Sequence, residues 1–449
     1  MVDAALKRLK GDETKRRDDL STLKNDIAVA EEDYIRRTTN HWTHLPVELF
    51  ADIAQMLVDE DIKHLIPLSH VCKDWRRVVE DSAGLWSTLV IGRARPWAKA
   101  ERWVKHSKGV IHSLVVPYES HERGKWDGDG LSGIRWDQLR AFKAEHWNLC
   151  SHLKAIGLEP GVLTSLTRYD YTNEVRTPQI PPFHSSWPIQ HLALAHVKLS
   201  QPLIDLLEGS IVTLSLSRMS FPSSGVQLSG SLESLVLDST DGPAFKELPD
   251  ELPDMHHLTL RQMGKHTLSL LLVKMPYLTS LRLHDCSSIK SEHLESLGKK
   301  SSGHLTTLVL DSVAIDSPKH LVNFLRSNPQ LTTLELTRMH GVVAVIEALA
   351  STENPSDSSE AEPVQAMCPK LNHLNLSNCQ ELGTGPIFRL IKSRNGASAP
   401  VDDVEKISAL ILDGCEKIEA EWLPWFRKHV GRFSCVYWTK KSGRYRAAA

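Results

Sequence analysis

Residues 278–336 read LTSLRLHDCSSIKSEHLESLGKKSSGHLTTLVLDSVAIDSPKHLVNFLRSNPQLTTLEL and contain the pattern apolar-x-x-Leu-x-Leu three times, at 278–283, 305–310 and 331–336. Leucines that alternate with other residues give a short strand one buried face. The pattern recurs along the chain, with central leucines at residues 192, 214, 235, 258, 281, 308, 334, 374 and 410. A unit of about 22 residues cannot bury this face alone. The sequence therefore predicts a stack of repeats.

A cysteine follows the alternating leucines at the same place in three copies. It occurs in Leu281-x-Leu283-x-x-Cys286 and again at Cys379 and Cys415. The pattern resembles the cysteine-containing class of leucine-rich repeat, in which the cysteine turns inward and a helix then returns to the next strand. The resemblance implies an α/β solenoid, a curved leucine-rich repeat stack with parallel strands on the concave face. A buried free cysteine behaves as a small apolar side chain, so we expect these thiols to pack and not to react.

The regular copies of the repeat define a domain from residue 189 to residue 438. Weaker copies at 111–116 and 153–158 fall in the preceding segment, 92–188, where we expect linker helices, loops and weak first repeats. Residues 351–366 are rich in Ser, Pro and acidic residues and lack an apolar period, so a flexible insertion is expected there. Residues 439–449 are expected to form a disordered tail.

The residues between and after the strand leucines face away from the core and form the exposed side of the predicted sheet. The early copies place small neutral residues there. The middle copies carry Arg261, Arg282, His284, Asp311, Glu335 and Asn375. A strip with a basic centre suits a protein segment with acidic or phosphorylated residues, so these six are our candidates for binding a target protein. The alternative is that the charges only solvate an exposed face.

Residues 45–89 carry more apolar residues than so short a segment can bury by itself. Within this stretch Leu45-Pro46-x-Glu48-Leu49 is followed by Val71-Cys72-Lys73-x-Trp75-Arg76 and then by Leu85-Trp86-x-x-Leu89. These motifs, in this order and spacing, resemble an F-box; the alternative is a helical hairpin inside a larger all-α domain. The resemblance implies a small all-α F-box unit at 41–91, which docks on the Skp adaptor of SCF-type cullin–RING ubiquitin ligases.

The apolar residues of this unit are the candidates for contact with the adaptor. Pro46 stands at the first helical position, where a missing N–H costs nothing, and Leu49, Ile53 and Leu57 fall four residues apart on one face. The full candidate set is Leu45, Pro46, Leu49, Ile53, Leu57, Leu65, Leu68, Val71, Cys72 and Trp75. Trp86, Leu89 and Ile91 are expected instead to cover the first repeat, since the ends of a solenoid need caps.

Residues 3–37, within an N-terminal segment 1–40, are expected to form one helix. Its apolar seam would consist of positions that alternate three and four apart, namely Leu6, Leu9, Glu13, Arg16, Leu20, Leu23, Ile27, Ala30 and Tyr34. The pattern permits either a short coiled coil for self-association or a solvated helix that leads into the next domain. We favour the solvated helix, because two seam positions are charged and such charges weaken a dimer.

The overall composition argues against several other classes of protein. The 449 residues carry 53 basic and 55 acidic side chains, and this near balance argues against binding to nucleic acid. The sequence contains no run of 18 apolar residues, and its first residues lack the apolar core of a secretory signal. Seven cysteines without a Cys-x-x-Cys pair indicate a reducing compartment, so the cytoplasm, the nucleus or both are expected.

The sequence also lacks familiar catalytic and metal-binding patterns. Its histidines and cysteines show no zinc-type spacing, and a calcium loop counted from Asp127 fails at Leu131 and Gln138. No phosphate-binding, dinucleotide-binding, zinc-protease or nucleophile-elbow motif occurs in the required context. We therefore expect that the protein is not an enzyme and binds no metal or cofactor. We expect a subunit that recruits a protein for ubiquitylation; the alternative is a leucine-rich repeat scaffold that assembles no ligase. The order of helix, F-box and irregular repeats resembles large F-box families of mushroom-forming fungi.

Overall fold

The computed structural model describes residues 15–34, 46–91, 96–117, 131–145, 162–172, 187–197, 201–219, 221, 226–240, 248–264, 268–301, 303–351, 366–396, 404–439 and 444–447. Leu45, the repeat copy at 153–158 and most of the insertion at 351–366 lie outside these residues, as do Leu6, Leu9 and Glu13 of the N-terminal seam. The chain divides into two compact units. A helical unit comprises Met1–Thr88 and Trp103–Gly109, and a repeat unit comprises Leu89–Arg102 and Val110–Ala449.

The helical unit consists of short helices around a small apolar core. Its elements after the N-terminal helix (residues 15–34) are α2 (Val47–Glu60), η1 (Ile62–His64), α3 (Leu65–His70), α4 (Lys73–Asp81) and η2 (Ala83–Trp86), and the end of α5 (Pro96–His106) also belongs to it. Phe50, Ala54 and Val58 repeat every four residues and place one face of α2 in the core. Asp61 ends α2 and caps η1 by accepting a hydrogen bond from the backbone N–H of Lys63.

The repeat unit is built on one sheet whose strands follow one another in sequence order, from β1 to β14. The pairings from β2 through β14 are all parallel. The strands are β1 (Thr88–Val90), β2 (Ser113–Val116), β3 (Ala141–Ala144), β4 (Arg168–Thr172), β5 (His191–Ala195), β6 (Thr213–Ser217), β7 (Ser234–Asp238), β8 (His257–Arg261), β9 (Ser280–His284), β10 (Thr307–Asp311), β11 (Thr333–Thr337), β12 (His373–Asn375), β13 (Ala409–Ile411) and β14 (Arg432–Ser434).

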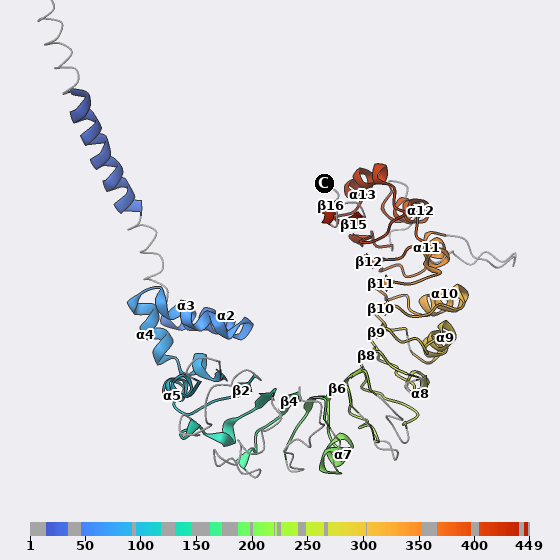
Figure 1. The fold of residues 1–449 in the computed structure, drawn as a ribbon, viewed down its shortest axis with the longest axis horizontal. Coiled ribbons are helices and arrows are strands. Elements are labelled where there is room, and N and C mark those ends of the chain that lie inside the picture. Colours follow the sequence, from blue (N-terminus) through green and yellow to red (C-terminus); the bar gives the residue numbers. More distant parts are fainter. Residues whose placement is uncertain are drawn as a thin grey trace, which may run out of the picture. The chain divides into compact units, whose positions relative to one another are not determined.

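Helices return the chain from one strand to the next and cover one face of the sheet. They are α7 (Gln201–Leu207), α8 (Leu268–Leu271), α9 (Ser291–Lys300), α10 (Pro318–Arg326), α11 (Val342–Ala350), α12 (Thr384–Asn395) and α13 (Leu423–His429), with short turns η5 (Trp136–Gln138) and η8 (Ala420–Trp422). Within the repeat unit the strands lie along the inner side of a curve and the helices along its outer side (Figure 1). This arrangement confirms the predicted α/β solenoid with parallel strands on the concave face.

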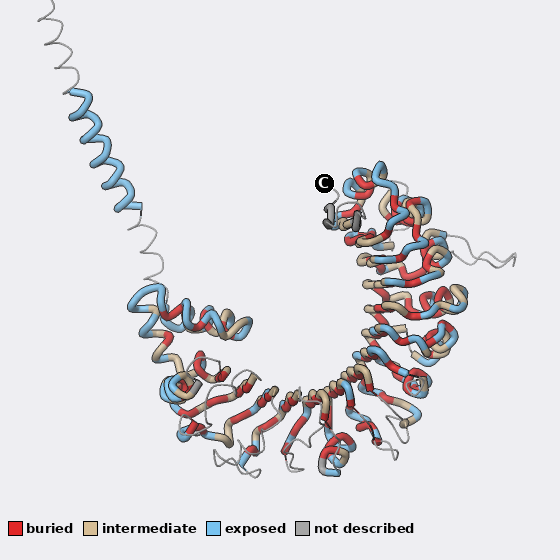
Figure 2. Tube along the Cα trace, viewed as in Figure 1, coloured by how far each residue is buried: buried red, intermediate tan, exposed pale blue. Residues whose placement is uncertain are grey.

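Burial alternates along the strands as the leucine pattern predicts. In β11, Leu334 and Leu336 are fully buried, whereas Thr333, Glu335 and Thr337 are partly exposed. The register aligns these leucines from strand to strand, so that Leu308 pairs with Leu334 and Leu334 with Leu374. In Figure 2, buried residues recur along the strands of the repeat unit and along the helices behind them. Each repeat therefore completes the core of its neighbours.

A turn with a left-handed residue follows most of the strands. The residue has a positive φ in nine consecutive repeats, at His196, Arg218, Ser239, Gln262, Asp285, Ser312, Arg338, Asn378 and Gly414. Its backbone N–H donates to a carbonyl of the next repeat, as from Asp285 to Asp311 and from Arg338 to Ser377. The ladder of hydrogen bonds thus continues one residue beyond the strand before the chain turns towards its helix.

The cysteines at the repeat phase are buried and hydrogen-bonded. The thiols of Cys286, Cys379 and Cys415 each donate to the carbonyl of the second leucine of the preceding repeat, at 3.0–3.5 Å between sulfur and oxygen. Cys435 lies instead at the position of the second strand leucine, and its thiol donates to the Leu412 carbonyl at 3.7 Å. Burial raises the pKa of the Cys415 thiol to about 12. A thiol that is buried and protonated satisfies a carbonyl group in the core, which agrees with the expected packing role.

The repeat unit has more strands than the leucine pattern predicts. β3 and β4 pair directly with each other and carry Phe142, Tyr169 and Tyr171 at the buried positions, and β14 adds a further strand that buries Phe426 against Phe433. Aromatic side chains thus replace leucine in β3, β4 and β14, whereas β1 and β2 bury Leu89 and Leu114. At the C-terminus, β15 (Val436–Thr439) pairs with β16 (Arg444–Ala447) as an antiparallel hairpin. Arg444–Ala447 thus form a strand within the segment where a disordered tail is expected from the sequence.

Candidate functional site

The helical unit exposes an apolar surface that its own core does not use. On α2, Leu49 is 51% exposed, Ile53 is 46% exposed and Met56 is 73% exposed, while Leu57 is partly buried. These residues lie on the helix face next to the one that carries Phe50 and Ala54. Single exposed apolar residues are normal, but a row of them at helical spacing indicates a surface for another protein.

Two of the predicted adaptor contacts lie in the interior instead. Leu65 is fully buried and Leu68 is 8% exposed, because α3 turns both side chains towards the core of the helical unit. These two predicted contacts therefore have little exposed surface to offer an adaptor. The residue between them in sequence, Ile66, is 41% exposed, and Val47 at the start of α2 is 58% exposed. Both were missed because a helical period alone does not tell which of two apolar faces is turned inward.

The remaining predicted contacts lie at the junction of α3 and α4. Val71 is 60% exposed and Cys72 is exposed. The Cys72 sulfur accepts a hydrogen bond from the backbone N–H of Trp75 at 3.4 Å and so caps α4. The Trp75 ring is partly buried and packs on Phe50 with 4.4 Å between ring centroids. Trp75 therefore supports the α2 surface from beneath, while Pro46 is exposed at the N-terminus of α2.

Trp86 is fully buried and joins the end of the F-box motif to the end of α5. Its indole N–H donates to the Val79 carbonyl at 2.7 Å, and its ring stacks on His106 with 4.4 Å between centroids. In the repeat unit, Leu89 and Ile91 are fully buried, and the Ile91 N–H donates to the carbonyl of Val115 next to the sheet. Leu89 lies in β1 and Ile91 directly follows it, so both belong to the first strand of the stack and do not form a separate cap over it.

The second candidate site is the exposed side of strands β8 to β12. All six predicted residues lie there: Arg261, Arg282, His284, Asp311, Glu335 and Asn375. The register places them in two rows. One row runs from Arg282 past Val309 to Glu335 and Asn375, and the other runs from Arg261 through His284 to Asp311. We call these six residues the concave strip.

Asp311 is held by a residue that the sequence analysis missed. The Arg338 guanidinium contacts both oxygens of Asp311, at 2.8 and 2.6 Å, and also lies 3.6 Å from Asp285. Thr337 and His284 add hydrogen bonds to the same carboxylate. The Arg338 guanidinium is the largest cause that lowers the pKa of Asp311, to about 2. Arg338 occupies the left-handed position after β11, and the leucine pattern does not predict that this turn brings its guanidinium to Asp311.

This pairing changes the charge pattern expected for the concave strip. Asp311 is neutralised by Arg338, and Glu335 accepts a hydrogen bond from the side-chain amide of Asn375 at 3.0 Å. Arg261 and Arg282 are exposed, and among the residues that the structure describes no carboxylate forms an ion pair with either. The two guanidinium groups are therefore the side chains of the strip most available to a ligand.

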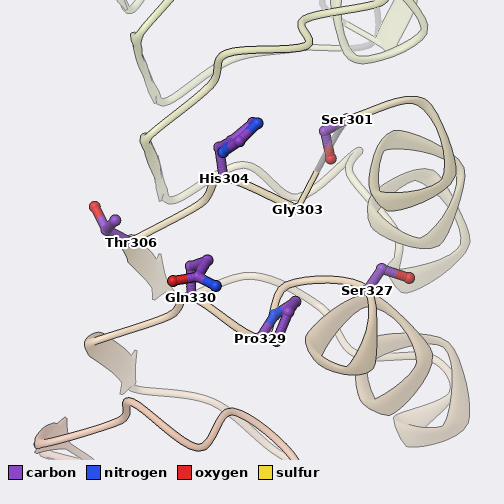
Figure 3. A pocket seen from close by; sticks show the side chains of 7 residues that line it. All are labelled: Ser301, Gly303, His304, Thr306, Ser327, Pro329 and Gln330. Atoms are coloured by element: carbon purple, nitrogen blue, oxygen red, sulfur yellow. The ribbon is translucent and has the colours of Figure 1, made fainter.

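A groove of about 620 Å³ lies between two repeats, where the chain enters β10 and β11. Figure 3 shows its lining residues, Ser301, Gly303, His304, Thr306, Ser327, Pro329 and Gln330. His304 is the only titratable residue of this set. The set contains no carboxylate or thiol, and the His304 ring lies against Tyr277 with 6.0 Å between ring centroids.

Comparison with known proteins agrees with the helical unit. The F-box-like family model matches residues 42–92. No curated protein matches the sequence. Among solved structures, the chain is similar to an internalin (inlF) of Listeria monocytogenes at 16% identity and a TM-score of 0.36, covering 72% of this chain and 84% of that one. The chain thus contains an F-box-like segment at residues 42–92, and the strand register described above shows leucine-rich repeats after it.

None of the helices in the described part of the chain has both the length and the apolar character needed to cross a membrane.

Proposed function

We propose that this chain is the substrate-recognition subunit of an SCF-type ubiquitin ligase, composed of a Skp adaptor, a cullin and this F-box protein. An F-box generally binds a Skp-type adaptor, and the domain at 42–92 is F-box-like. The observation that carries the proposal is the exposed row Leu49, Ile53 and Met56 on a unit that already has its own core. A surface of this kind is stabilised when a partner covers it.

The adaptor would contact the exposed residues and not the buried ones. The proposed docking surface comprises Pro46, Leu49, Ile53, Leu57, Val71 and Cys72 from the predicted set, together with Val47, Met56 and Ile66. Trp75 acts beneath it through its contact with Phe50. Leu65 and Leu68 are left out because their side chains are already buried.

The concave strip would bind the protein to be ubiquitylated. Arg261 and Arg282 lie on adjacent strands, β8 and β9, and project from the same side of the sheet. Guanidinium groups form paired hydrogen bonds with carboxylate or phosphate oxygens, so an acidic or phosphorylated segment is the ligand that these two residues suit.

The proposed mechanism is proximity without a catalytic group from this chain. The helical unit holds the adaptor and the repeats hold the target, so that a target lysine stays near a charged ubiquitin-conjugating enzyme. Such tethering turns an encounter between two proteins into a step within one complex. The proposal places the protein in the cytoplasm, the nucleus or both.

The ligase assignment is tested by immunoprecipitation of the full chain and of a variant that lacks residues 45–89. We expect the full chain to capture both a Skp adaptor and a cullin, and the variant to capture neither. Capture of the adaptor without a cullin would favour the scaffold interpretation. Proteins that accumulate in cells expressing the shortened variant are the candidates for the target.

The role of the concave strip is tested by Arg261→Glu combined with Arg282→Glu. We expect this variant to lose the co-purified target and to keep the adaptor, because charge reversal repels an acidic segment. Arg326→Glu on α10 is the matched control, since Arg326 is an exposed arginine on the helical side of the stack. Equal loss of target from both variants would contradict the assignment.

A further inference from the structure

The N-terminal helix (residues 15–34) has an apolar stripe that none of the described residues of its unit covers. Every residue from 15 to 34 is exposed, and Figure 2 shows the helix exposed along its whole length. Leu20, Leu23 and Ile27 are 57%, 59% and 52% exposed and are spaced three and four residues apart. Ala30 and Tyr34 continue this spacing. An isolated helix of this length is marginally stable in water, so its stripe calls for a covering partner.

We propose that the covering partner is the same helix of a second copy of this chain, in a parallel two-stranded coiled coil. Leu20, Ile27 and Tyr34 take the a positions of the heptad, and Leu23 and Ala30 take the d positions. Leucine and isoleucine at a and leucine at d are compatible with a two-stranded seam. The proposal goes beyond the ligase function and does not depend on it.

The charges beside the seam distinguish a parallel pair from an antiparallel one. The g positions are Asp19, Asp26 and Asp33, and the e positions are Arg17, Lys24 and Glu31. In a parallel pair, g of one helix faces e five residues further along the other helix. Asp19 then faces Lys24 of the second copy, which is attractive, whereas Asp26 faces Glu31, which is repulsive.

An antiparallel pair would have less favourable charge contacts than a parallel pair. There g faces g, so all the g–g contacts join two aspartates. The e–e contacts would set Lys24 against its own copy, and only Arg17 with Glu31 is attractive. Because like charges face each other in most of these contacts, the parallel orientation is preferred.

The charged seam positions, which are the reason for expecting a solvated helix, mark where the apolar seam of the coiled coil begins. Arg16 falls at a d position and precedes Leu20 by one turn, so the apolar seam runs from Leu20 to Tyr34. A seam of about two heptads gives a weak dimer whose population depends on protein concentration. The interaction therefore has to be measured over a concentration series.

Sedimentation equilibrium of the full chain over such a series tests the proposal. We expect a reversible monomer–dimer equilibrium that Leu23→Asp and Ile27→Asp abolish. Val29→Asp is the matched control, because Val29 is 65% exposed but lies at a c position, away from the seam. A monomer at every concentration overturns the proposal, and so does a dimer that Val29→Asp weakens as much as Ile27→Asp does.

The orientation is tested by a variant that should gain affinity. Asp26→Lys replaces the two repulsive contacts of a parallel pair by attractive ones and should tighten the dimer about tenfold. In an antiparallel pair the substituted side chain faces its own copy, so no gain is expected. Asn25→Lys, at an outward f position, controls for the change in net charge and helix propensity. A dimer that Asp26→Lys tightens no more than Asn25→Lys does overturns the parallel assignment.

Discussion

Removal of the Arg338 side chain should measure how strongly the concave strip is organised by its own charges. In the folded chain the pKa of Asp311 falls from its ordinary 3.8 to about 2, chiefly because of the hydrogen bonds from Arg338. A shift of this size corresponds to roughly 2 kcal/mol before screening. Arg338 is half exposed to solvent while Asp311 is 16% exposed, so we expect Arg338→Ala to lower the free energy of unfolding by about 1 kcal/mol at pH 7.

The assay is urea unfolding of the wild type and of two arginine variants. Arg389→Ala is the matched control, since Arg389 pairs with Glu347 at 2.7 Å but both side chains are about half exposed. We expect this control to cost less than about 0.5 kcal/mol. Repeat arrays can unfold in more than one step, so the variants are compared by the shift of the transition in which the middle repeats unfold.

The pH dependence of the Arg338→Ala effect has a definite sign. The folded pKa of Asp311 is lower than its unfolded pKa, so the stabilisation is present above pH 3.8 and is lost as the pH falls from 3.8 towards 2. The gap between wild type and Arg338→Ala should therefore be full at pH 7 and should close over this acidic range. Equal costs for Arg338→Ala and Arg389→Ala, or a gap that persists at pH 2, would refute the reasoning.

Three further predictions concern other parts of the chain. Iodoacetamide should modify Cys72 first among the six cysteines that the structure describes, because the others are buried and burial raises the pKa of Cys415 to about 12. Peptide mass spectrometry checks the order of labelling, and early labelling of Cys415 would contradict the prediction. Arg394→Met should lower the free energy of unfolding by about 3 kcal/mol and the melting temperature by several degrees, because the buried guanidinium donates to three backbone carbonyls. An unchanged melting curve would disprove this role. In the same assay, Gly414→Ala should lower the free energy of unfolding by about 1 kcal/mol more than Gly383→Ala, because Gly414 has a positive φ and Gly383 does not.

The repeat fold could be predicted because its signal is local and repeated. Alternating leucines such as Leu334 and Leu336 fix a buried face every few residues, and their phase predicts that Cys379 points inward. Strands β3, β4 and β14 could not be found in this way. β4 uses Tyr169 and Tyr171 at the same positions, and these large rings can occupy a buried strand as well as leucines do once neighbouring repeats make room for them.

The candidate sites could be predicted only in part, because they depend on which face is turned inward. Leu49 and Leu65 look alike in the sequence, yet α2 exposes the first and α3 buries the second. The ion pair of Asp311 with Arg338 joins residues 27 positions apart and depends on a left-handed turn that the sequence pattern does not encode. The strand period predicted that Asp311 lies on the exposed side of the sheet. Its partner Arg338 became evident only from the structure of the turn.

The most direct test of the proposed function is the affinity of the full chain for a purified Skp-type adaptor, measured by titration calorimetry with paired variants. Leu49→Asp places a carboxylate in the proposed docking surface, and Leu272→Asp changes a leucine of similar exposure, 48%, in the repeat unit. Burial of the half-exposed Leu49 side chain is worth about 1 kcal/mol, and a buried carboxylate adds a larger cost.

We predict that the wild type and Leu272→Asp bind the adaptor equally, and that Leu49→Asp binds more than about 100-fold more weakly while its circular dichroism spectrum is unchanged. Wild-type affinity in a folded Leu49→Asp protein would contradict the proposed docking surface, and absence of adaptor binding by the wild type would contradict the ligase function itself.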